Sequence, residues 1–116
     1  MGGGVAMDIQ FAGKLEQTFN EEKKLQRKYG HRAKLIQRRL GELRAADSLA
    51  VMKTLPSAAC HRLTGDRKGQ YAVNVGHPFR MVFIPKNDPL PQHQHGGLDE
   101  TKVTTIEIQE IVDYHG

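Results

Sequence analysis

The sequence predicts a single α+β domain in which two N-terminal helices pack on a small antiparallel β-sheet that is followed by a short C-terminal tail. Apolar residues recur at helical spacing up to about residue 45 and alternate with polar residues after Pro56. The chain has 116 residues, of which 38% are hydrophobic and 26% are charged, and these values suit one globular domain. We therefore expect residues 11–116 to form the domain and the glycine-rich residues 1–10 to be a flexible N-terminus.

The N-terminal half predicts two helices. Phe11, Leu15 and Phe19 follow an i, i+4, i+8 spacing, so a first amphipathic helix is expected from about residue 13 until Gly30 ends it. A second helix is expected from about residue 31. Its apolar stripe consists of Ile36, Leu40 and Leu43, and its cations, spread over the remaining surface, are Arg32, Lys34, Arg38, Arg39 and Arg44. The two helices should form a hairpin, and Asp47 or Ser48 should cap a further short turn.

After Pro56 the pattern changes to the alternation typical of strands. Residues 71–75 and 80–84 are rich in β-branched and aromatic side chains and flank a turn sequence, which predicts a β-hairpin. A third strand is expected at residues 103–109, where Ile106 and Ile108 share one face. Residues 85–102 form a long polar loop insertion between the strands. Because loops of this length are uncommon, we expect it to be either mobile or functional.

Charge is distributed unevenly along the chain. The net charge is +4, with 10 Lys and Arg against 6 Asp and Glu in residues 1–50, 6 against 2 in residues 51–98, and 1 against 5 in residues 99–116. The basic surface favours polyanionic partners, although positive charge that only solvates the helices explains it equally well.

Several classes of protein are excluded by simpler features. No stretch approaches the roughly 18 apolar residues of a membrane-spanning helix, and no leader pattern opens the chain, so we expect a cytoplasmic protein with no membrane partner. The single cysteine, Cys60, rules out an internal disulfide and a cysteine-rich zinc site. Cys60 and His61 point apart in an extended chain, which counts against a thiolate–imidazole pair.

Two segments carry residues suited to chemistry on a phosphate. A turn between Gly65 and Gly69 can present backbone N–H groups and the side chain of Arg67 or Lys68 to an anion, although such segments are often only turns that lead into a strand. Arg80 opens the next strand and forms an anion clamp if it lies beside Arg67; otherwise it is a solvated arginine.

The second segment is the C-terminus, where Asp113, Tyr114 and His115 are consecutive. Histidine exchanges protons near neutral pH, tyrosine donates a hydrogen bond, and a carboxylate orients an imidazole. The alternative is a frayed terminus without a role.

Taken together, these motifs resemble a HigB-type toxin. The residues that carry the resemblance are His61, Leu63, Gly65, Asp66, Arg67, Gly69 and Tyr71, then Phe79-Arg80-Met81-Val82-Phe83, and finally Asp113-Tyr114-His115. The HigB type belongs to the RelE/ParE superfamily of toxin–antitoxin systems, also called plasmid maintenance killer proteins. The resemblance implies a ribonuclease that enters the ribosomal A site, contacts rRNA and cuts mRNA there. It also implies a HigA-like helix-turn-helix antitoxin as partner, and no metal or other cofactor.

The resemblance also implies roles for individual residues. The ribose 2′-OH attacks the adjacent phosphorus, which requires a base, an acid and positive charge around the phosphorane. One of His61 and His115 is expected to act as base and the other as acid, with Asp113 orienting an imidazole and Tyr114 contacting the scissile nucleotide. Arg67 and Arg80 are expected to stabilise the phosphorane, and Arg62 and Lys68 to bind RNA. Two alternatives share the fold: a ParE-like gyrase-inhibiting toxin and a catalytically inactive antitoxin-binding domain.

Overall fold

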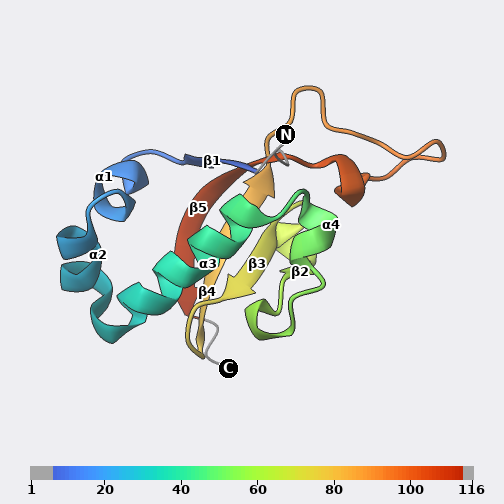
Figure 1. Cartoon of the computed structure of the whole chain (residues 1–116). Coiled ribbons are helices and arrows are strands. Elements are labelled where there is room, and N and C mark those ends of the chain that lie inside the picture. Colours follow the sequence, from blue (N-terminus) through green and yellow to red (C-terminus); the bar gives the residue numbers. More distant parts are fainter. Residues whose placement is uncertain (1–6, 114–116) are drawn as a thin grey trace.

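A five-stranded mixed sheet forms the centre of the computed structural model, which describes residues 7–113 (Figure 1). The strands are β1 (Asp8–Phe11), β2 (His61–Arg62), β3 (Tyr71–Asn74), β4 (Phe79–Pro85) and β5 (Thr105–Asp113). Their order is β1-β5-β4-β3-β2, and neighbours are antiparallel except for β1 and β5, which are parallel. The α+β class is confirmed, and the three predicted strands correspond to β3, β4 and β5.

Helices cover one face of this sheet. They are α1 (Leu15–Phe19), α2 (Glu22–Tyr29), α3 (Ala33–Ala45) and α4 (Leu49–Met52), with 3-10 turns at Gly30–Arg32, Pro56–Ala58, Gly65–Arg67 and Glu100–Lys102. Figure 1 shows α3 lying across the sheet, with α1 and α2 to one side. The predicted stripe of Ile36, Leu40 and Leu43 is buried. Of the two residues expected to cap the short turn, Ser48 is the one that caps α4, because its side chain accepts a hydrogen bond from the Val51 N–H.

The N-terminal region differs from the prediction in two ways. Residues 8–10, expected to be flexible, belong to β1, which pairs with β5 from Asp8 opposite Thr105 to Phe11 opposite Ile108. The expected first helix is divided into α1 and α2 because the backbone is extended at Glu21. Phe11 matched a helical spacing but is a strand residue, and its ring packs on Phe19 at 5.4 Å between centroids. The spacing of Phe11 with Leu15 and Phe19 continues across the break between β1 and α1 and therefore imitates a helical repeat.

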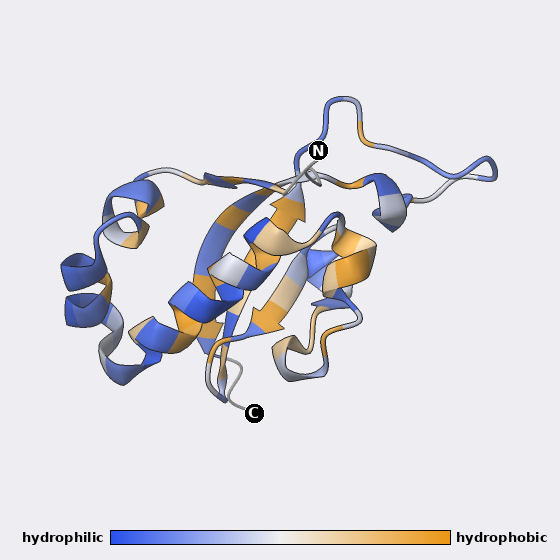
Figure 2. Cartoon of the chain, viewed as in Figure 1, coloured by the Kyte–Doolittle hydropathy of each residue, from blue (hydrophilic) through white to orange (hydrophobic). Residues whose placement is uncertain are grey.

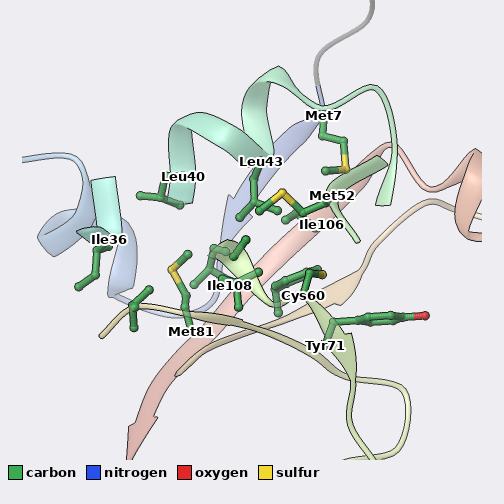
Figure 3. Packing of buried hydrophobic residues seen from close by; sticks show 14 of the residues in the cluster. Met7, Ile36, Leu40, Leu43, Met52, Cys60, Tyr71, Met81, Ile106 and Ile108 are labelled. Carbon is green, nitrogen blue, oxygen red and sulfur yellow. The ribbon is translucent and has the colours of Figure 1, made fainter. Parts of the chain in front are cut away.

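The main hydrophobic core lies between α3 and the sheet. Figure 3 shows Leu40 and Leu43 of α3 above Met81 of β4 and Ile106 and Ile108 of β5. All five side chains are at most 2% exposed. This burial anchors α3 to β4 and β5 and fixes which face of each strand points away from the helix.

The long insertion between β4 and β5 is folded rather than extended. Figure 2 shows it as largely hydrophilic, and Figure 1 shows it projecting beyond the sheet. Gln92 pairs with Leu98 across it, and the Asn87 side chain bonds to Thr104 and to the Thr105 N–H, each at 3.0 Å. Backbone and side-chain hydrogen bonds therefore order this polar segment, and Leu98 packs against the main core.

Strand β5 is longer than predicted. It continues to Asp113, so Glu110 to Asp113 are strand residues and not part of a C-terminal tail. The register with β4 shifts between Val82 and Phe83: Val82 lies opposite Glu110, and Phe83 lies opposite Ile108. This irregularity changes which β5 side chains share a face.

Candidate functional site

The sheet face that points away from α3, here called the distal face, has an apolar floor bordered by charged residues. Leu63, Ala72 and Val82 are buried in this floor, and Val112 packs against them. The register aligns His61, Ala72, Val82 and Glu110 in one row across β2, β3, β4 and β5, and Asn74, Arg80 and Val112 in the next row. Residues in register share a face, so His61, Arg80 and Glu110 lie on the distal face.

His61 stands at the edge of the distal face on β2, with its side chain exposed. Its Nδ1 lies 2.9 Å from the Ala59 carbonyl oxygen. A carbonyl oxygen only accepts, so we assign the hydrogen to Nδ1. Ala59 has a left-handed backbone with φ 49°, and this turn directs its carbonyl toward the ring. The Nε2 atom is then the one that can take up or deliver a proton at the surface.

Arg67 reaches across the distal face from the 3-10 turn between β2 and β3. Its guanidinium donates to Gln70 Oε1 at 3.0 Å and pairs with Glu110 Oε2 at 3.0 Å. Gln70 directly precedes β3, whereas Glu110 is on β5, so the Arg67 side chain reaches across β4, which lies between these two strands. The predicted Gly65–Gly69 turn exists, and it delivers a cation to the face that carries His61.

Arg80 lies in the second row of the distal face, two residues before Val82 on β4. It donates to Asn74 Oδ1 at 3.3 Å, and the same oxygen accepts the Gly76 N–H at 3.0 Å. Asn74 therefore links the arginine to the β3–β4 turn. The structure brings Arg67 and Arg80 to one face, as the anion-clamp hypothesis requires.

Asp113 occupies a different position. It ends β5 opposite Phe79, and strand alternation places it on the α3 face with Ile111, which packs on the main core. The Arg32 guanidinium stacks over the Phe79 ring at 4.1 Å on that side. The structure thus separates Asp113 from the row of His61, while Tyr114 and His115 lie outside the described residues.

The two predicted RNA-binding residues lie away from this row. Arg62 alternates with His61 on β2 and pairs with Glu100 at 3.2 Å. Arg62 and Lys68 line a hollow of about 440 Å³ between the sheet edge and the long insertion, together with Tyr71, Leu90 and Leu98. None of His61, Arg67, Arg80 and Glu110 lines this hollow.

Glu100 holds the end of the long insertion to the body of the domain. Its carboxylate accepts from Lys53 Nζ at 2.8 Å, from Arg62 and from the Tyr71 hydroxyl. Burial, which alone would raise the pKa of Glu100, is outweighed by these three donors, so its pKa is lowered. Burial first, and then the bond to Glu100, raises the pKa of Tyr71 to about 12, so its hydroxyl stays a donor. Figure 3 shows this ring pointing away from the other labelled core side chains.

The Glu100→Gln substitution should destabilise the domain in a pH-dependent way. A carboxyl whose pKa is lower in the folded than in the unfolded chain stabilises above its unfolded value of about 4.3, and this contribution is lost as the pH falls through the folded pKa. We expect a loss of about 1–2 kcal/mol at pH 7 that disappears toward pH 3. Urea denaturation of both proteins across this range measures it. A difference that stays constant down to pH 3 would contradict the assignment.

Cys60 is a core residue, 7% exposed, although its neighbour His61 is exposed. Burial raises the pKa of its thiol to about 12, so at neutral pH it is not a thiolate nucleophile. The two neighbouring side chains thus lie in different surroundings, Cys60 in the core and His61 at the exposed sheet edge.

Alkylation of Cys60 should therefore require unfolding. We expect iodoacetamide at pH 8 to modify the folded protein at least about 100-fold more slowly than the protein in denaturant, because reaction needs an accessible thiolate. Mass spectrometry over time measures both rates. Equal rates would show that the residue is accessible in the folded state.

Sequence reasoning missed Glu110, Gln70 and Asn74 as neighbours of the candidate arginines. Glu110 was assigned to a tail, so its alternation with Ile111 on a continuing strand was not used.

Between residues 7 and 113, no group of three or more His, Cys, Asp or Glu side chains is arranged to hold a metal ion. Within the same range no helix is long and apolar enough to span a membrane.

Comparison with solved structures finds the same fold in several bacterial proteins. A chain of the YoeB-YefM complex from Staphylococcus aureus matches with a TM-score of 0.54 and 18% identity, over 95% of this chain and 98% of that chain. A YoeB/ParE toxin from Agrobacterium tumefaciens matches with 0.53 and 12%, over 94% and 100%. YafQ from E. coli strain BL21(DE3) matches with 0.51 and 14%, over 93% of each chain. No protein-family model and no curated protein matches the sequence. The α+β fold expected from the resemblance is thus confirmed.

Proposed function

We propose that this chain is the toxin of a type II toxin–antitoxin system, of the HigB type, and that it cleaves mRNA on the ribosome. The observation that carries the proposal is the grouping of His61, Arg67 and Arg80 on the distal face. A proton-transfer group beside two cations suits attack of a ribose 2′-OH on the adjacent phosphorus. The fold shared with a YoeB/ParE toxin supports the same class.

In this proposal the chain's own side chains supply the chemistry without a metal. His61 exchanges a proton through Nε2, and the two arginines stabilise the negative charge that grows on the phosphorane oxygens. His115 is proposed to join them at the scissile phosphate, and Tyr114 is proposed to contact the nucleotide. Because Asp113 lies on the α3 face, we propose that it orients the segment that follows it and not His61.

We further propose a cognate antitoxin that inhibits this chain, a HigA-like helix-turn-helix protein. The complex of YoeB with YefM provides an example of this fold with a bound partner. An adjacent reading frame with a helix-turn-helix pattern is expected.

Basic residues of this chain that contact rRNA should make its binding to the ribosome weaken steeply as the salt concentration rises. A titration of ribosome binding against salt concentration checks this expectation.

Induced expression with mapping of RNA 5′ ends tests the function. Codon-phased cuts in mRNA that disappear in the His115→Ala variant are the expected result. A DNA-damage response without mRNA cuts would instead indicate a gyrase inhibitor of the ParE type, and the absence of toxicity would indicate an inactive antitoxin-binding domain. Cuts that persist at full rate in His115→Ala would contradict the role of that residue.

A further inference from the structure

Glu110 is the only carboxylate residue in the two rows of the distal face that contain the candidate catalytic groups, within the part of the chain that the structure describes. Its side chain is 48% exposed, so it is accessible to a substrate, and it lies 3.0 Å from the Arg67 guanidinium. Asp113, the carboxylate expected from the sequence, is on the opposite face. A carboxylate held beside a phosphate-binding cation is suited to take a proton from a hydroxyl next to that phosphate.

The row geometry gives this carboxylate a defined place relative to His61. The two residues are three strand spacings apart, about 14 Å between Cα atoms, with the buried residues Ala72 and Val82 between them. Their side chains extend from opposite ends of the row, and Arg67 crosses between β3 and β5. In-line displacement at phosphorus needs the attacking and leaving oxygens on opposite sides of the phosphorus. A base at one end of the row and an acid at the other satisfy this requirement.

We propose that Glu110 is the general base of the cleavage reaction, which makes His61 the general acid; this rests on the proposed ribonuclease function. Glu110 removes the proton from the ribose 2′-OH as the 2′-oxygen forms a bond to phosphorus. The bond from phosphorus to the 5′-oxygen breaks, and that oxygen receives a proton from Nε2 of cationic His61. The products are a 2′,3′-cyclic phosphate and a 5′-hydroxyl. Arg67, beside the base, binds the phosphate oxygens.

The competing interpretation is that the Arg67–Glu110 pair only fastens the β2–β3 connection to β5. The Glu110→Gln substitution distinguishes this structural interpretation from a catalytic role, because the glutamine amide oxygen still accepts a hydrogen bond from Arg67 but does not take up a proton. Exposed pairs contribute little to stability, so we expect a melting temperature within about 5 °C of the wild type. Glu107→Gln is the matched control. Glu107 lies on the same strand and accepts from Gln109 at 2.8 Å, but it has no contact with Arg67.

The test measures single-turnover cleavage of mRNA on purified ribosomes. We expect Glu110→Gln to be at least about 100-fold slower than the wild type, Glu110→Asp to be intermediate, and Glu107→Gln to stay within about threefold. If the wild type cleaves and Glu110→Gln matches it, the assignment of Glu110 is overturned while the proposed function stands. If the wild type does not cleave mRNA, both are overturned.

An mRNA with sulfur in place of the scissile 5′-oxygen distinguishes base from acid. A thiolate leaves without being protonated, so this substrate should restore cleavage by His61→Ala and leave Glu110→Gln slow. Restoration of Glu110→Gln by the sulfur substrate would make Glu110 the acid and would overturn the proposal. A loss in Glu110→Gln accompanied by a collapse of the melting temperature would establish the structural interpretation instead.

Discussion

Replacement of Arg39 by methionine should lower the free energy of unfolding by about 3 kcal/mol. Arg39 is on α3, yet it is only 3% exposed. Its guanidinium donates to the Asn74 carbonyl at 2.8 Å and to the Ser57 carbonyl at 2.7 Å, and it pairs with Glu42 at 3.0 Å. Methionine fills the aliphatic volume but leaves these acceptors without their donor inside the fold. Urea denaturation should show a lower midpoint with an unchanged slope.

Arg38→Met is the matched control for this substitution. Arg38 is the neighbouring residue on the same helix and also faces Glu42, but at 3.7 Å and with a side chain that is 71% exposed. Such a pair contributes between about 0 and 1 kcal/mol, so the control should fall within about 0.5 kcal/mol of the wild type. Equal losses in the two variants would mean that the charge of α3, and not the buried contacts of Arg39, stabilises the domain.

Arg39 also illustrates what a helical period reveals and what it omits. The spacing of Ile36, Leu40 and Leu43 identified the buried stripe of α3 correctly, because burial against a sheet follows the helical repeat. Arg39 was grouped with the solvated cations, since nothing local distinguishes it from Arg38. Its acceptors belong to residues 18 and 35 positions away along the chain, and only the folded arrangement brings them together.

The sheet was predictable where alternation runs over several residues. Strands β4 and β5 have seven and nine residues, and the four residues of β3 were recognised through the hairpin that they form with β4. Strands β1 and β2 have only four and two residues and no such partner next to them in the sequence, so they leave little pattern. Strand pairing, which the local pattern does not reveal, decides the arrangement of the site. β2 places His61 on the distal face, and the shifted register of β4 with β5 places Glu110 opposite Val82. The residue types of the site could thus be predicted for His61, Arg67 and Arg80, but not which carboxylate joins them.

Replacement of His61 by alanine should slow mRNA cleavage by about 100- to 10,000-fold, the range by which a positioned proton-transfer group accelerates a reaction. The exposed ring makes one hydrogen bond within residues 7–113, from Nδ1 to the Ala59 carbonyl, so the fold should be little affected. Single-turnover cleavage on purified ribosomes measures the effect. His93→Ala, which removes another exposed histidine from the long insertion, should cleave at the wild-type rate.

His61→Asn separates the proton-transfer role of this residue from its positioning. The asparagine amide can donate to the Ala59 carbonyl in place of Nδ1, but it has no group equivalent to Nε2 and does not exchange a proton near neutral pH. We therefore expect His61→Asn to be as slow as His61→Ala. Substantial activity in the asparagine variant would show that the imidazole only holds the β2 edge in place, and proton transfer would then have to come from a different residue. Because β2 has only two residues, this experiment also tests whether so short a strand positions a catalytic group.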